Sequence, residues 1–144
     1  MNGPHRLYAI VAVLFITALV TPAVQAEAKP LKPTAEWRGS VEDLTLQTAA
    51  PASGALTSQK AFADLWKAWK PDDKLPEVDF TKELVLVATT RGSRLSLSAA
   101  LDEQGNLQPR GISTRDLRPG FRFHLIAVSR EGVKTINNKP LPKD

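Results

Sequence analysis

The sequence predicts an α+β domain in which one amphipathic helix packs on a mostly antiparallel sheet of about five strands. Apolar residues at helical spacing between residues 62 and 69 indicate the helix. An uninterrupted apolar run at residues 84–88 indicates a buried strand, and alternating side chains at residues 94–101 and 121–128 indicate two more. Because the helix is followed by several strands in succession, we expect a meander with the helix on one sheet face.

Residues 1–26 have the organisation of a secretory signal peptide. His5 and Arg6 precede an apolar run over residues 7–20, and Ala26 ends a segment of small side chains suited to cleavage. The run is shorter than the roughly 20 residues that cross a bilayer as a helix, so we expect no membrane span after cleavage near Ala26. The protein should therefore be periplasmic or secreted.

Composition limits the classes of function. The chain has no cysteine, which excludes disulfides, thiolate metal ligands and thiol nucleophiles. A formal net charge of +4 is small beside the concentrated basic surface of a typical nucleic-acid-binding domain, so no nucleic acid is expected as a partner. About 118 residues remain after cleavage, which is the length of a single domain.

The mature chain begins with residues 27–36, where two prolines and few apolar residues predict a flexible linker. The single α+β domain is expected to span residues 37–140, with residues 141–144 as a tail. Apolar residues separated by acidic and hydroxyl residues predict a first strand within residues 37–48. Turn residues at 51–54 then precede the helix.

The helix is predicted from four apolar residues that share one face of a 3.6-residue period. They are Phe62, Leu65, Trp66 and Trp69. Thr57 or Ser58 can cap the start, and Pro71 prevents continuation. Aromatic residues at this spacing usually belong to a hydrophobic core, so we expect both tryptophans to be buried against the sheet.

Residues 83–90 form the predicted central strand, since they are apolar on both alternating faces. Residues 94–101 and 107–114 are expected to pair as a hairpin through the turn residues between them. A strand of about ten residues follows from Phe121, and the last is predicted at residues 133–136. Asn137 and the prolines after it are expected to end the fold.

The acidic connector between the helix and the central strand carries Asp72, Asp73, Glu77 and Asp79. Its spacing matches no calcium loop, because the glycine and glutamate of an EF-hand are missing from their positions. We expect a solvated loop, no metal site and no cofactor.

Several segments carry a resemblance to a known family: Ala68 with Trp69, and residues 76–80, 82–87 and 129–134. Together they resemble small uncharacterised secreted bacterial proteins and, more distantly, the C-terminal domain of the protease-complex-stabilising lipoprotein family. The resemblance covers about residues 37–136 and implies a fold with a stabilising role in the envelope. The chain departs from the family in lacking the lipoprotein cysteine and the glycine-tyrosine turn after the central strand.

The candidate binding residues come from an arginine-rich part of the chain. Between residues 91 and 130 there are seven arginines, three acidic residues and no lysine. The guanidinium group binds carboxylate, sulfate or phosphate at two points. If Leu95, Leu97 and the phenylalanines near residue 122 face the helix, the opposite side chains share an open sheet face. These candidates for anion or partner binding are Arg94, Ser96, Ser98, Arg122 and His124.

Two functions follow as alternatives. The first is a secreted, non-enzymatic accessory or binding protein of the bacterial envelope that recognises an anionic glycan or stabilises a partner protein. A solvated face without function stays open beside it. The second is a small envelope hydrolase using His124, the one histidine left after cleavage. That hydrolase would need His124 beside a serine and an orienting carboxylate, as in a catalytic triad with Ser96 or Ser98.

Overall fold

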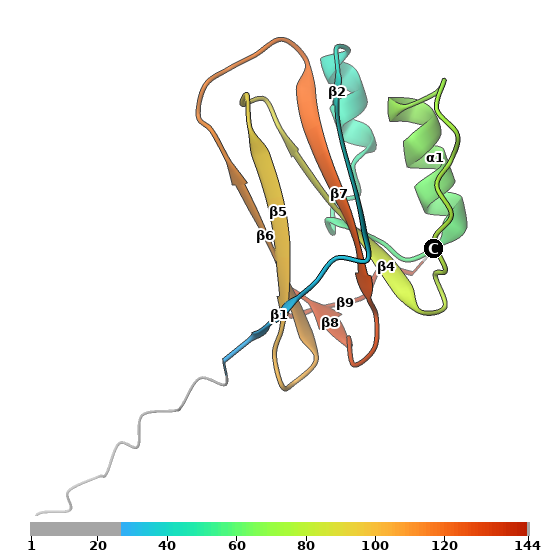
Figure 1. Cartoon of the computed structure of the whole chain (residues 1–144), viewed down its shortest axis with the longest axis vertical. Helices are drawn as coiled ribbons and strands as arrows, with labels where there is room; N and C mark the ends of the chain where they lie inside the picture. Colours follow the sequence, from blue (N-terminus) through green and yellow to red (C-terminus); the bar gives the residue numbers. More distant parts are fainter. Residues whose placement is uncertain (1–26, 144) are drawn as a thin grey trace, which may run out of the picture.

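The computed structural model describes residues 27–143 and contains two facing sheets with a helix on the outer side of one (Figure 1). The first sheet has the strand order β2-β7-β4-β3 and the second the order β1-β5-β6-β8-β9. The α+β class is therefore confirmed, whereas the expectation of one sheet of about five strands is wrong. The signal-peptide prediction lies outside the described residues.

The bounds of the elements are as follows: β1 Lys29–Leu31, β2 Ala35–Val41, the 3-10 helix η1 Leu44–Ala49, β3 Ala55–Leu56, α1 Gln59–Trp69, β4 Glu83–Thr90, β5 Leu95–Leu101, β6 Asn106–Ser113, β7 Phe121–Ser129, β8 Thr135–Ile136 and β9 Lys139–Pro140.

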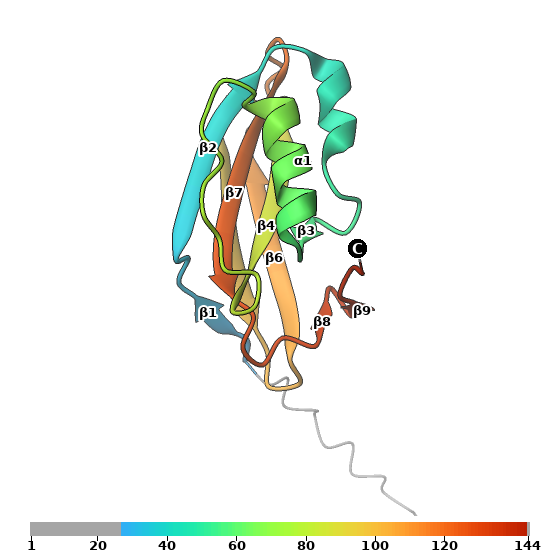
Figure 2. The same cartoon turned by 90° about the vertical axis from the view of Figure 1, so that its right-hand side faces the viewer.

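Helix α1 lies on the face of β2, β7 and β4, as predicted (Figure 2). The Ser58 hydroxyl caps its start by accepting a hydrogen bond from the Ala61 N–H at 3.2 Å. All four predicted apolar residues are buried: Phe62, Leu65, Trp66 and Trp69. The Trp69 ring stacks on Phe123 with ring centroids 5.2 Å apart. This aromatic core fixes the helix on the sheet.

A second core lies between the two sheets. Leu86 and Ile126 of the first sheet pack with Leu97 and Leu107 of the second. Strands β4 and β7 therefore contribute to both cores through alternate residues, which explains why their sequences are apolar on both faces. The helix, the first sheet and the second sheet thus form three layers (Figure 1).

The predicted linker at residues 27–36 instead contributes to a strand of each sheet and so connects the two sheets. Strand β1 pairs antiparallel with β5, and β2 begins at Ala35 and pairs antiparallel with β7. The prolines did not prevent this because β1 is an edge strand, where a residue without an N–H is tolerated. The same segment therefore closes one side of the sandwich (Figure 1).

The first predicted strand is shorter than expected. Strand β2 ends at Val41, and η1 follows, because the Asp43 carboxylate accepts hydrogen bonds from the Thr45 N–H and hydroxyl. The hydroxyl is the main reason that the pKa of Asp43 lies below its usual value. Local side-chain hydrogen bonds of this kind compete with a strand.

The C-terminal segment is also more ordered than predicted. Asn137 and Asn138 adopt left-handed conformations with φ of 48° and 62°, which makes a two-residue turn between β8 and β9. The Thr57 hydroxyl donates to the carbonyl of Pro142 at 3.1 Å. The predicted tail is thus attached to the fold at least as far as Pro142.

Candidate functional site

One end of the sandwich contains an open cavity of about 610 Å³ between the β5–β6 hairpin and the strands β2 and β7. We call it the arginine cavity, because three guanidinium-bearing residues line it and no acidic residue does. Its lining residues are Arg38, Gly39, Ser93, Arg94, Leu95, Ser96, Ile112, Ser113, Thr114, Arg122 and Phe123.

The five candidates predicted from sequence do not share one sheet face. Leu97 packs into the core between the sheets and not against the helix, so Ser96 and Ser98 lie on the outer face of the second sheet. His124 lies on β7 and faces β5 from the first sheet. The prediction was wrong because it assigned β5 and β7 to one sheet.

Three of the candidates nevertheless meet at the arginine cavity. Arg94 of the turn before β5, Ser96 of β5 and Arg122 of β7 are all among its lining residues. Ser98 lines a separate groove beside β1 instead. His124 is 1 % exposed and does not line the cavity.

The three arginines differ in the hydrogen bonds and ion pairs that their guanidinium groups make within the fold. The Arg38 Nη1 donates to the Leu95 carbonyl at 3.2 Å, and its Nη2 lies 3.6 Å from Glu36 Oε2. The Arg122 Nη1 donates to the Pro119 carbonyl at 3.2 Å. Within residues 27–143, the Arg94 guanidinium has no hydrogen-bond or ion-pair partner. Arg94 and much of Arg122 are therefore available to a ligand.

The hydroxyl-bearing rim of the cavity is held by Asp116. Its Oδ1 accepts hydrogen bonds from the Ser93 N–H at 2.9 Å and the Ser93 hydroxyl at 3.1 Å. Hydrogen bonding, chiefly from the Thr114 hydroxyl, keeps the pKa of Asp116 far below its usual value. Gly92 fits here because a Cβ would lie 2.3 Å from the Thr114 carbonyl oxygen. The rim is thus organised without a ligand.

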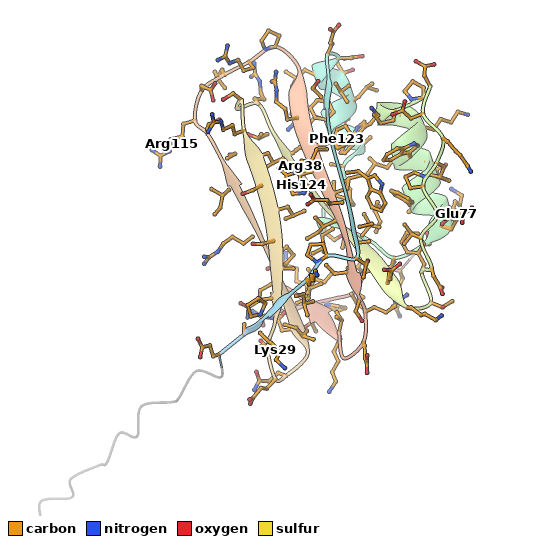
Figure 3. All side chains as sticks on the ribbon, in the orientation of Figure 1. Lys29, Arg38, Glu77, Arg115, Phe123 and His124 are labelled. Atoms are coloured by element: carbon orange, nitrogen blue, oxygen red, sulfur yellow. The ribbon has the colours of Figure 1, made fainter. Side chains whose placement is uncertain are left out.

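His124 connects the two sheets beneath the cavity. Its Nδ1 accepts a hydrogen bond from the Leu97 N–H at 2.9 Å, so the proton of the neutral ring is on Nε2. That nitrogen lies 3.3 Å from Glu36 Oε2. Figure 3 shows His124 and Arg38 side by side between the two sheets.

Together, Arg38 and His124 replace a missing strand beside β5. The Thr114 N–H donates to the Arg94 carbonyl across the β5–β6 pair. Because successive residues of a strand direct their backbone N–H and C=O groups to opposite sides, those of Leu95 and Leu97 point away from β6. Strand β1 covers that edge only from Ala99 onward. The Leu95 carbonyl is bound by Arg38 and the Leu97 N–H by His124. We call Glu36, Arg38 and His124 the edge clamp.

Sequence reasoning missed Glu36 because it assigned residues 27–36 to a linker, and it missed Arg38 because it recognised only part of the strand that carries both. The alternation of Glu36, Arg38 and Ser40 with less polar neighbours was the available signal, since it places all three on one strand face. The register that sets Arg38 opposite His124 depends on a pairing across most of the chain.

The buried histidine predicts a pH-dependent stability. Burial lowers the pKa of His124, the charge of Arg38 lowers it further, and Glu36 partly offsets both. The unfolded chain therefore binds this proton more readily, so the free energy of unfolding should fall as the pH drops below about 6.5 and should not respond to this group above that range. Carboxylates with lowered pKa values, such as Asp102, change the free energy of unfolding only below about pH 4.

Urea unfolding at pH 7.5 and pH 5.5 checks this expectation. The variant His124→Asn keeps an acceptor near the Leu97 N–H but does not titrate, so its stability should change less between the two pH values. Equal pH dependence in both proteins would show that His124 is not the responsible group.

Comparison with known proteins found no matching family model, curated protein or solved structure. Within the described residues, no helix is long and apolar enough to cross a membrane, and no cluster of metal-ligating side chains is present. The fold and the cavity thus define a structural class only: a three-layer α+β domain with a cationic cavity at the open end of its two sheets.

Proposed function

We propose that the protein is an exported, non-enzymatic binding module of the bacterial envelope that recognises an anionic ligand in the arginine cavity. The observation that carries the proposal is the convergence of Arg38, Arg94 and Arg122 on one cavity that no acidic residue lines. Isolated surface arginines usually pair with nearby acids, whereas Arg94 has no such partner among residues 27–143. Export follows from the signal peptide expected at residues 1–26.

The lining favours an acidic glycan as the ligand. Guanidinium groups bind sulfate or carboxylate at two points, and the hydroxyls of Ser93, Ser113 and Thr114 can bond to sugar hydroxyls. Leu95 and Ile112 add apolar surface beside them. An acidic patch on a partner protein shares the same charge chemistry and is the second candidate ligand.

The hydrolase alternative gains no support from the geometry of His124. Its Nδ1 is occupied by the Leu97 N–H and its Nε2 faces Glu36, which leaves no nitrogen for a nucleophile. Within the described chain, no serine hydroxyl bonds to this ring. A triad requires such a bond to one nitrogen while a carboxylate orients the other.

Replacing Arg94 and Arg122 by alanine tests the proposal. Each guanidinium contact to an anion contributes about 1.5–3 kcal/mol, so loss of both should weaken binding of a sulfated hexasaccharide by about a hundredfold or more. Isothermal titration calorimetry of both proteins measures this change. The free energy of unfolding should change by no more than about 1 kcal/mol, because neither residue belongs to the edge clamp.

The matched control is the double variant Arg110→Ala and Arg115→Ala. It removes the same charge from exposed arginines that do not line the cavity. Figure 3 shows Arg115 on the loop that follows β6, far from Arg38. We expect this control to bind the hexasaccharide with nearly wild-type affinity at about 0.15 M salt. Equal weakening in both double variants would indicate diffuse attraction and would contradict a built site.

A further inference from the structure

The outer half of strand β6 has an unpaired edge. Strand β6 pairs with β5 from Leu107 to Ser113, but β8 covers its other side only at Asn106 and Leu107. The bond from the Thr114 N–H to the Arg94 carbonyl fixes the alternation, so the backbone groups of Gly111 and Ser113 point away from β5. Within residues 27–143, these groups have no hydrogen-bond partner.

The opposite edge of the β5–β6 hairpin, which is the outer edge of β5, has its backbone groups satisfied by side chains. There the edge clamp satisfies the Leu95 carbonyl and the Leu97 N–H with side chains, which prevents a further strand from pairing. At the β6 edge no side chain of residues 27–143 does this for Gly111 or Ser113. Pro109, which has no N–H, limits pairing further along that edge. One edge is thus protected and the other remains open.

The side chains near the open edge indicate the chemistry of a partner. Ile112, which follows Gly111 on β6, is 62 % exposed and is one of the three large apolar residues exposed within residues 27–143. Arg110 and Arg115 are also exposed. The nearby Asp116 already bonds to Ser93 and Arg118. The surface is therefore apolar and positively charged.

We propose that the β6 edge binds an extended acidic segment of a partner protein as an additional β-strand. Main-chain hydrogen bonds to Gly111 and Ser113 would hold the segment, as in other cases of strand addition. An apolar side chain of the segment would pack beside Ile112 and a carboxylate beside Arg110, because neighbouring residues on one face of adjacent strands interact. This surface adjoins the arginine cavity, because Ile112 and Ser113 line both, whereas Pro109, Arg110 and Gly111 lie outside the cavity lining.

A peptide titration tests the proposal. The probe is a ten-residue peptide of alternating glutamate and valine, with an alternating lysine and valine peptide as the charge control. Nuclear magnetic resonance of the ¹⁵N-labelled protein should show the largest shift changes at residues 109–111, which do not line the arginine cavity, with the acidic peptide and much smaller ones with the basic peptide. The absence of changes at these residues would overturn the proposal.

Two variants at one position separate edge pairing from other contacts. Gly111→Pro removes the free N–H and should weaken peptide binding by about tenfold or more. Gly111→Ala is the matched control, because a Cβ there would lie 3.7 Å from the Ala88 Cβ, which is an ordinary contact. Equal affinities of these two variants would contradict strand addition. If Gly111→Pro fails to fold, Ser113→Pro provides the same test, because it removes the other N–H that points away from β5.

The remaining outcomes distinguish this edge from the cavity and from self-association. The double variant of Arg110 and Arg115 should bind the acidic peptide less tightly, whereas the double variant of Arg94 and Arg122 should bind it normally. The reverse result would assign the peptide to the cavity. Light scattering that shows a dimer, with a monomer for Gly111→Pro, would make a second copy the occupant and overturn the proposed partner.

Discussion

Replacing Trp69 by alanine should lower the free energy of unfolding by about 3–5 kcal/mol. The side chain is 4 % exposed, and its ring contacts Phe123 and Phe121 with centroids 5.2 and 5.3 Å away. Its Nε1 donates to the Leu46 carbonyl at 2.8 Å, which ties η1 to the helix. The substitution therefore removes aromatic packing and this attachment together.

Equilibrium urea unfolding followed by circular dichroism measures this loss. Trp69→Phe is the matched control, since it retains a ring but loses the hydrogen bond, and it should lose less than half as much stability. A loss below about 1 kcal/mol for Trp69→Ala would contradict the packing of α1 on the first sheet.

Replacing His124 by alanine should cost about 2–4 kcal/mol, because the change leaves a space between the sheets and removes the acceptor of the buried Leu97 N–H. It also removes one partner of Glu36 Oε2, which keeps its ion pair with Arg38. The loss of local stability should be largest at the end of β5 that lines the arginine cavity.

The comparison with His124→Asn isolates the contribution of the acceptor. At pH 7.5 the asparagine variant should retain at least half of the stability that alanine loses. Hydrogen exchange should show faster exchange of the Leu97 amide in the alanine variant than in the asparagine variant. Similar exchange in both would contradict the role of His124 in the edge clamp.

Local patterns were sufficient for much of the secondary structure. The period of the apolar residues and the cap at Ser58 predicted α1, because a helix is stabilised by contacts three and four residues apart. The alternation in β5 and the turn after it likewise predicted the β5–β6 hairpin. These features need no knowledge of distant residues.

The assignment of strands to two sheets could not be predicted in this way. Strand β7 pairs with β2 and β4, which are separated from it by most of the chain or by the whole β5–β6 hairpin. Alternation in β7 indicates two faces but does not show which element covers each. The buried position of His124 follows from the second sheet, which the single-sheet prediction lacked.

The candidate site was predicted in its chemistry and only partly in its geometry. The excess of arginine over acid identified the charge, and Arg94, Ser96 and Arg122 do line one cavity. Arg38 was missed because its strand was only partly recognised, and Ser98 points to another surface. Which arginines converge depends on how the two sheets separate at one end.

The central claim is that the arginine cavity is a specific anion site. The most direct test is a titration of ¹⁵N-labelled protein with a sulfated hexasaccharide, followed by nuclear magnetic resonance. We predict the largest shift changes at residues 38, 93–96, 113–114 and 122, and their loss in the double variant of Arg94 and Arg122. Changes spread evenly over all exposed arginines, or centred on Arg110 and Arg115, would contradict the claim.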